Sequence, residues 1–464
     1  MSVASMDIRA DPPLGTWPAS LGFGPIDERS ERFREELGLP TDAPIVMTGH
    51  QPILWHSGIL SKYLAVEALA ETSGARAAWL VVDQDVVDPY AIDVPARDAE
   101  HRLISRTLRL AREPGEGLAA SSVKPQRALT VEESLDLALP DLRERLPVIR
   151  DALAAEAGEP TMARQVVRAN FELLRDVLPE RPIVYASDLN RTSLFAELLG
   201  AMRREPEKAV SSYNQAASEF PEAGIAPLRS DDVQDIHELP LWSVAPSEPR
   251  RRVFHHELDG IDPTTLAPRA LLVTAMMRLA GCELFVHGTG GAAYDRVTER
   301  WMKHWLGATL APKAAITADL RLKIEVEHVT ASDVARATWL AHSARHNPGR
   351  LGDPAAQNVK DELVRAIEEM RERGDDPADL YQKLHENRRT FAFAHAKELA
   401  ELDRDARALA RKAGDSTVAS RRDWPSVLYA NDQLVELRDA IRRAMTRGVD
   451  RASAKKRLSR PRAR

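Results

Sequence analysis

The stretch IVMTGHQPILWHSG, residues 45–58, predicts a strand, a tight turn at Gly49 and the start of a helix. Ser57 is a suitable N-cap for a helix that begins near Ile59. Polar groups between the carboxyl end of a strand and the amino end of a helix occupy the usual ligand crevice of an open α/β sheet. Free N–H groups in that position favour anions, so we expect a phosphate or carboxylate compound to bind here.

The next apolar run, AAWLVV at residues 77–82, predicts a second strand that is covered on both faces. It ends in the polar sequence DQD, residues 83–85. Two strands joined by one helix form a βαβ unit, and its right-handed crossover brings both carboxyl ends to one edge of the sheet. The side chains expected to converge at this edge are His50, His56, Asp83 and Asp85.

Two further strands are predicted by RPIVYASDLN, residues 181–190, and CELFVH, residues 282–287. The first ends in Ser187 and Asp188, and the second runs into GTGGAAYD, residues 288–295. Three glycines in four residues let a backbone approach a ligand closely, which makes this a second candidate phosphate loop. It matches neither the dinucleotide fingerprint nor the Walker loop, and a simple strand-to-helix turn remains the alternative.

These motifs resemble, in their order along the chain, those of the bacillithiol-synthesis cysteine ligase family. The positions that match the family are Thr48, Gly49, Gln51, Asp83, Asp85, Gly288, Gly290 and Tyr294. The family typically has Gln where this chain has His50 and His where it has Gln84, so the chain resembles a divergent branch.

The resemblance implies a Rossmann-like core similar to class I nucleotidyl-transferring synthetases, with helical insertions and a C-terminal antiparallel coiled-coil hairpin that dimerises. It also implies an amide-forming activity, in which cysteine is added to the amino group of glucosaminyl malate.

Composition is consistent with a large enzyme that works in the cytoplasm. A chain of 464 residues can bury a sizeable core, and its single cysteine, Cys282, excludes an internal disulfide framework. There is no stretch of about 18 apolar residues and no basic-then-apolar start, so we expect no membrane partner. The formal net charge of −6 argues against duplex nucleic acid as the main ligand.

We expect four regions along the chain. Residues 1–350 form the core, with a mainly helical insertion near 100–180; residues 351–415 form the hairpin; residues 416–446 return to the core. Residues 447–464 carry eight basic side chains against Asp450 and are expected to be a disordered tail.

The hairpin is also predicted directly from the sequence, because apolar residues recur at helical spacing on both sides of a break at Gly374. A projecting hairpin leaves part of its apolar stripe uncovered. We therefore expect a homodimer that buries residues such as Leu384, Phe391 and Leu402.

Three classes of function are compatible with these features. The first is a ligase that binds small-molecule substrates, with ATP or ADP as the candidate nucleotide and Lys62 or Arg296 as candidate phosphate-neutralising cations. The second is a metal-dependent hydrolase or transferase. The third is a non-catalytic dimeric scaffold.

The candidate site residues follow from these classes. The candidate catalytic residues are Asp83, Asp85 and His50. The candidate substrate- or nucleotide-binding residues are Thr48, Gly49, Gln51, His56, Ser187, Asp188, Gly288, Gly290, Gly291, Tyr294 and Asp295. A divalent metal, if the second class holds, would be bound by His50, His56, Asp83, Asp85 and His287.

Overall fold

The structure is a computed structural model that describes residues 6–458 except 23, 25, 128, 130–136, 140, 232, 233 and 235. The chain divides into two compact units. The core unit comprises Met1–Val94, Arg106–Leu322 and Arg422–Arg464, and the helical unit comprises Pro95–Ser105 and Lys323–Arg421. The helical unit therefore begins earlier in the chain than residue 351, where the sequence analysis placed it.

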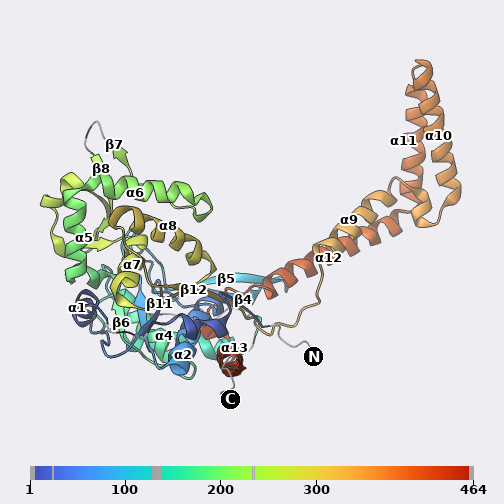
Figure 1. Ribbon diagram of the computed structural model, residues 1–464. Helices are drawn as coiled ribbons and strands as arrows, with labels where there is room; N and C mark the ends of the chain where they lie inside the picture. Colours follow the sequence, from blue (N-terminus) through green and yellow to red (C-terminus); the bar gives the residue numbers. More distant parts are fainter. Residues whose placement is uncertain are drawn as a thin grey trace. The chain divides into compact units, whose positions relative to one another are not determined.

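The core unit is built on a six-stranded sheet with the order β1-β12-β11-β2-β3-β6. Its strands are β1 (Asp7–Asp11), β2 (Ile45–His50), β3 (Arg76–Val81), β6 (Ile183–Tyr185), β11 (Leu284–His287) and β12 (Lys313–Asp319). Figure 1 labels β6, β11 and β12 of this sheet. All neighbours are parallel except β1 and β12. Numbered along the chain, the five parallel strands lie in the order 3-2-1-4-5, which is the order of a doubly wound Rossmann-type sheet. The predicted α/β core with a largely parallel sheet is confirmed.

Successive side chains on each strand point to opposite faces, and helices cover both. On one face, Ile45, Met47 and Leu80 belong to an apolar cluster that also contains side chains from five helices. These helices are α1 (Glu28–Glu36), α5 (Ser193–Arg204), α6 (Pro206–Glu219), α7 (Ala270–Met276) and α8 (Thr289–Leu306). On the other face, Tyr63 of α2 (Ser57–Ser73) packs edge-on against Trp79 of β3.

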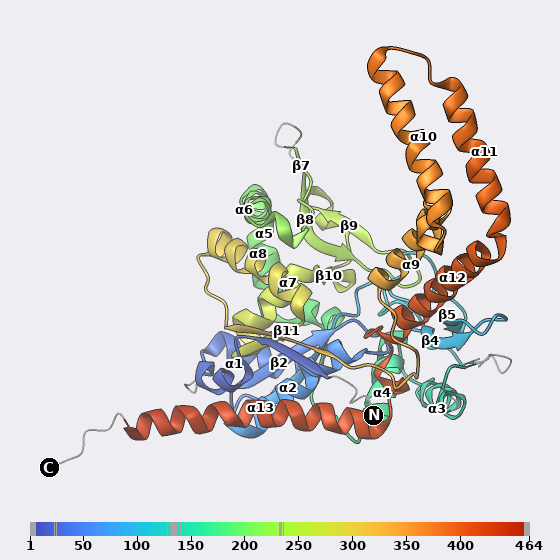
Figure 2. The same ribbon diagram turned by 90° about the vertical axis from the view of Figure 1, so that its right-hand side faces the viewer.

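Helix α2 is the most enclosed helix of this arrangement. It lies between the sheet and α13 (Asn431–Leu458), which runs alongside it (Figure 2). Every residue from Ser57 to Leu69 is buried. A helix covered on two sides must be apolar almost all round, which explains why its sequence shows little amphipathic contrast.

The segment expected to be mainly helical, near 100–180, differs from the prediction at its start. It begins with a β-hairpin of β4 (Ala91–Arg97) and β5 (Leu103–Arg109), and only then forms α3 (Leu142–Ala155) and α4 (Met162–Leu174). Apolar and polar residues alternate in AIDVPAR and LISRTLR, and this period of two residues favours strands over helix. The prediction of a helical start was therefore wrong. A second sheet contains β7 (Ser230–Asp231), β8 (Ile236–Ser243), β9 (Arg251–Phe254) and β10 (Leu266–Pro268).

The helical unit contains two helix pairs. Helices α10 (Pro354–Arg373) and α11 (Ala378–Ala394) lie side by side and antiparallel (Figure 2), while α9 (Ala331–Ala344) packs along α12 (Ala396–Ala419). The predicted hairpin corresponds to α10 and α11 only, because its second helix is divided at His395. Ile367, Phe391 and Leu399 are already buried within the single chain.

The carboxyl-terminal segment belongs to the core unit from Arg422 onward. Trp424 and Tyr429 are buried there, and the Tyr429 hydroxyl donates to the Leu320 carbonyl at 2.8 Å. Helix α13 continues to Leu458, so the expected disordered tail is helical up to that residue, and residues 459–464 lie outside the described part. In the part of the chain that the structure describes, no helix is both long and apolar enough to span a bilayer.

Gly49 should be intolerant of any side chain. A Cβ at this position would lie 2.7 Å from both Cβ and O of Leu80 on the neighbouring strand. We expect Gly49→Ala to lower the free energy of unfolding by about 1–3 kcal/mol, because β2 and β3 would have to separate locally. Urea denaturation measures the change. Gly158→Ala is the matched control, since nothing lies within 4 Å of a Cβ at that turn; equal effects of the two substitutions would contradict the steric explanation.

Candidate functional site

The candidate site lies where β2 and β11 meet, which is the topological switch point of the sheet. The two strands are neighbours and parallel, and α2 and α8 follow them on opposite faces. A crevice at this point is the usual ligand position in doubly wound folds. Here the amino ends of both helices reach the same edge, so their free N–H groups favour a negatively charged ligand.

Lys62 of α2 is the buried cation at this switch point. Its ammonium group donates to the Gly49 carbonyl at 2.7 Å, and its side chain is 5 % exposed. Lys62 also reaches β11, because a Cβ on Gly288 would lie 3.8 Å from its Cδ. Within the described residues it has no carboxylate partner. Burial lowers the pKa of Lys62 to about 7.

His50 lies at the end of β2, beside Lys62. Burial, followed by the positive charge of Lys62, holds the pKa of His50 well below its usual value. Its Nδ1 lies 3.4 Å from the Gln51 carbonyl, which can only accept a hydrogen bond. The neutral ring would therefore carry its proton on Nδ1 and leave Nε2 as a free base.

His56, and not Ser57, caps α2. Its Nδ1 accepts from the Gly58 N–H at 3.1 Å, whereas the Ser57 hydroxyl donates to the Ala318 carbonyl at 3.1 Å. Burial lowers the pKa of His56, an effect that the nearby Asp423 opposes. The predicted cap was wrong because a buried serine hydroxyl satisfied a tertiary partner, which the local sequence does not reveal.

His287 ends β11 and is held by a buried carboxylate. Its Nε2 lies 2.6 Å from Asp295, which is 1 % exposed and also forms an ion pair with Arg278 at 2.6 Å. Burial raises the pKa of Asp295, but the His287 hydrogen bond and the charges of His287 and Arg278 outweigh it and lower the pKa. Asp295 was expected to bind ligand; instead it orients His287.

The remaining predicted residues of these two loops fall into two groups. Thr48 is fully buried and donates to the Val286 carbonyl at 2.7 Å, so it joins β2 to β11 and is not available to a ligand. Gly290, in the first turn of α8, is exposed, and Tyr294 is 45 % exposed. Thr289, which the sequence analysis did not select, is exposed beside them. Gly291 lies against the His287 ring, where a Cβ would approach Nδ1 to 2.8 Å.

A second cluster forms where β3 and β6 end. Both carboxylate oxygens of Asp83 accept from Ser187, one from its N–H at 2.8 Å and one from its hydroxyl at 2.5 Å. Burial raises the pKa of Asp83 to about 6. Asp188 forms an ion pair with Arg164 at 3.0 Å. The ends of β3 and β6 therefore meet, but the side chain of Asp83 is 2 % exposed and faces Ser187.

Asp85 belongs to a third group. It accepts from the Gln51 amide at 3.1 Å and from Arg250 at 2.8 Å, and the Arg250 guanidinium lies over the Trp242 ring, 4.3 Å from its centroid. The sequence analysis did not select Arg250 as a site residue. The run of three arginines at residues 250–252 was the feature of the sequence that could have indicated it. Arg296, considered as a phosphate-neutralising cation, pairs instead with Glu222 at 2.9 Å.

The five proposed metal ligands do not assemble. Among the described residues, no group of three or more His, Cys, Asp or Glu side chains is close enough to hold a metal ion. The Asp83 carboxylate faces Ser187, Asp85 faces Arg250, and His287 faces Asp295. This arrangement gives the metal-dependent alternative no geometric support.

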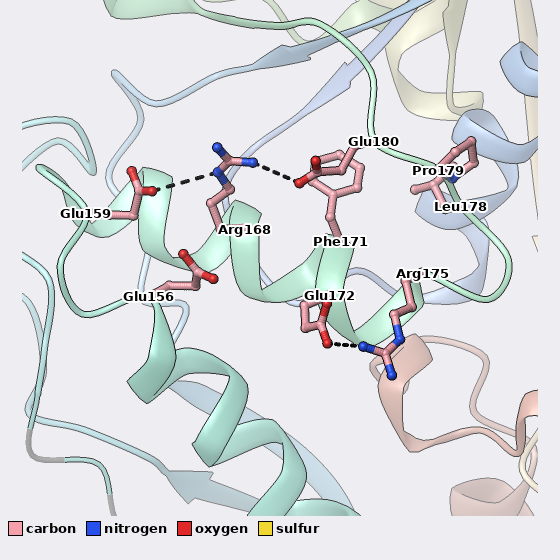
Figure 3. Close-up of a pocket in the computed structure, with 9 residues that line it drawn as sticks. All are labelled: Glu156, Glu159, Arg168, Phe171, Glu172, Arg175, Leu178, Pro179 and Glu180. Atoms are coloured by element: carbon pink, nitrogen blue, oxygen red, sulfur yellow. Dashed lines mark hydrogen bonds and ion pairs between the residues drawn. The ribbon is translucent and has the colours of Figure 1, made fainter.

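A surface hollow of about 590 Å³ lies elsewhere in the core unit (Figure 3). It is lined by residues of the connection between α3 and α4, of α4 and of the segment before β6. Arg168 bridges Glu159 and Glu180 across it, and Arg175 pairs with Glu172 (Figure 3). Both of its arginines are thus paired with glutamates of the same lining, and none of its lining residues comes from the ends of β2, β3 or β11. The switch point between β2 and β11 is the better candidate because the buried Lys62 there has no carboxylate partner among the described residues.

The low pKa of Lys62 predicts how the free energy of unfolding changes with pH. Between about pH 7 and pH 10, Lys62 binds fewer protons in the folded state than in the unfolded chain, where its pKa is 10.5. The free energy of unfolding of the wild type should therefore rise with pH through this window, by up to about 1.4 kcal/mol per pH unit relative to Lys62→Met. Urea denaturation of both proteins tests it. The free energy of unfolding of Lys62→Met should exceed that of the wild type by the largest amount near pH 7, and this difference should shrink as pH rises. A difference that does not change with pH would contradict the low pKa of Lys62.

Comparisons with known proteins give little similarity. No protein-family model and no curated protein matches the chain. Among solved structures, a product-bound crystal structure of a parasite tRNA synthetase aligns over 93 % of this chain and 97 % of that chain, with 10 % sequence identity and a TM-score of 0.25. The strand order of the sheet by itself identifies the doubly wound fold class.

Proposed function

We propose that this chain is a carbon–nitrogen ligase that binds an anionic, activated acid at the switch point and joins the acid to an amine of a small metabolite. The observation that carries the proposal is the buried Lys62 ammonium group, which lies between the ends of β2 and β11 without a carboxylate partner in the described part of the chain. Burying an unpaired cation is costly, and an anionic ligand would compensate for it.

The surroundings of Lys62 supply further groups that suit an anion. The amino ends of α2 and α8 present backbone N–H groups, and Thr289 and Gly290 are exposed there. His287, oriented by Asp295, lies at the end of β11. These groups could hold the phosphate of a nucleotide or of an activated acid, and they would stabilise the negative charge that leaves during amide formation.

Amide synthesis through ATP has two balanced steps. A carboxylate oxygen first attacks the α-phosphorus of ATP, which forms an acyl adenylate and releases pyrophosphate. The amine nitrogen then attacks the acyl carbon, the bond to AMP breaks, and the amine gives up a proton. His50 is suited to accept that proton, because its lowered pKa keeps the ring neutral near pH 7 with Nε2 free.

The two aspartates would have different roles. Asp85 is about a quarter exposed and accepts from Gln51 and Arg250, so it can orient an incoming amine. Asp83 is buried and its oxygens accept from Ser187, which makes it a positioning residue for the β6 end. The resemblance to bacillithiol-synthesis cysteine ligases suggests cysteine as the acid and an amino sugar conjugate as the amine.

Lys62→Met should abolish most of the nucleotide-dependent activity. The assay measures cysteine-dependent formation of AMP from ATP with glucosaminyl malate as the amine. We expect a rate loss of about 100-fold or more, because a buried cation that stabilises a leaving phosphate contributes about 3 kcal/mol or more. His50→Ala should lower the rate of amide formation while leaving binding of ATP, followed by thermal stabilisation, intact.

Lys303→Met is the matched control, because Lys303 is exposed near the far end of α8. It should retain the wild-type rate. If Lys62→Met keeps full activity, or if ATP stabilises neither the wild type nor the control, the proposal is wrong. Comparing the metabolites of cells with and without the gene identifies the substrates if cysteine and glucosaminyl malate are inactive.

We also propose that the protein is a homodimer joined through α10 and α11. Phe391, expected to be buried by dimerisation, is already covered within one chain, but Phe393, Val359 and Tyr381 are 88 %, 44 % and 39 % exposed. Large apolar side chains left open on a helix pair favour a self-interface.

Light scattering tests the dimer. The wild type should have the mass of two chains, and Phe393→Ser with Tyr381→Ser should shift it toward one chain, because these rings supply the apolar area. Val86→Ser, which removes a similarly exposed apolar side chain from the core unit, should leave the mass unchanged. A single-chain mass for the wild type, or a dimer that survives deletion of residues 354–394, would refute this interface.

A further inference from the structure

We propose a second anion-binding site, in the helical unit, that takes a small polyanion such as a diphosphate or a polycarboxylate. It is a cavity of about 140 Å³ among the residues after α9 and the facing sides of α10 and α11. The basic side chains that line it are Arg345, His346, Lys360, His385 and Arg388. No acidic residue is part of the lining, and Leu384 and Phe391 supply its apolar wall.

The positive charges of this cavity are largely uncompensated. Arg345 forms an ion pair with Asp403 of α12. Lys360 donates instead to the amide oxygen of Asn347 at 2.6 Å, and Arg388 donates to Nδ1 of His346 at 3.5 Å. Within the described residues, neither Lys360 nor Arg388 has a carboxylate partner. Like charges held this close repel one another, and a bound anion would relieve the repulsion.

The lowered pKa of His346 is consistent with the same positive potential. Its pKa is lowered first by burial and then by electrostatic interactions, in decreasing order, with Arg388, His342, Lys360 and Arg345. No carboxylate is among these influences. The ring is therefore an acceptor for Arg388 in the empty cavity and becomes an additional donor when an anion favours its protonation.

The size of the cavity limits the ligand. A water molecule occupies about 30 Å³ in the liquid, so the cavity has room for about four or five waters. Diphosphate fits this space. Because Lys360 lies on α10, Arg388 on α11 and Arg345 after α9, one anion would hold three segments of the unit together by charge-assisted hydrogen bonds.

Isothermal titration with inorganic pyrophosphate at low ionic strength tests the site in the full chain. The proposal is independent of the ligase function, so the titration is made in Lys62→Met as well as in the wild type, and the Met variant should keep this binding event. Lys360→Gln with Arg388→Gln should weaken it by about tenfold or more, which is about 1.4 kcal/mol or more. Circular dichroism confirms that each variant is folded.

Arg371→Gln with Lys383→Gln is the matched control, because it removes the same charge from the same two helices at positions that do not line the cavity. Its affinity should stay within about twofold of the wild type. Equal weakening in both double variants would mean that pyrophosphate responds to overall charge only, and the absence of binding in folded Lys62→Met would assign all binding to the core unit. Either result would overturn the proposal. As a second measurement in the Lys62→Met background, pyrophosphate should raise the melting temperature of the parent and of the control more than that of Lys360→Gln with Arg388→Gln.

Discussion

The close approach of β2 and β3 at Gly49 is the constraint on which both the sheet and the candidate site depend. There is no room for a side chain, because Leu80 occupies the space that a Cβ would need. The Gly49 carbonyl is also the hydrogen-bond acceptor that fixes the Lys62 ammonium group. The residue that lets two central strands pair therefore also positions the charge at their carboxyl ends.

Lys62 connects the packing of the core with the chemistry proposed for it. Its helix is enclosed by the sheet and by α13, so the amine has little access to water and loses part of its affinity for a proton. The same burial keeps His50 neutral. An anion bound beside Lys62 would raise the pKa of its ammonium group, so ligand binding near neutral pH should take up protons. The low-dielectric surroundings that make the site unstable when empty would strengthen its interaction with a ligand.

The two units place their basic groups in different environments. In the core unit, His287 is held by a buried chain of Asp295 and Arg278, and Asp85 is paired with Arg250, so most charges near the sheet edge have a fixed partner. In the helical unit, Lys360 and Arg388 contact neutral acceptors. Fixed ion pairs orient a site, whereas uncompensated cations leave electrostatic energy that a ligand can recover.

The sequence alone determined that β2, β3, β6 and β11 are strands of a parallel sheet and that their polar ends share an edge, because apolar runs and turn residues are local signals. It also identified His50 and the Gly288 loop as parts of that edge, and named Lys62 only as one candidate among the cations. The tertiary structure decided which polar residues remain available: Thr48 and Ser57 bond to distant carbonyls, Asp295 pairs with Arg278, and Asp83 faces Ser187. It also divided the long hairpin at His395 and paired α12 with α9. These outcomes depend on contacts between residues far apart in the chain, and periodicity and spacing carry no information about such contacts.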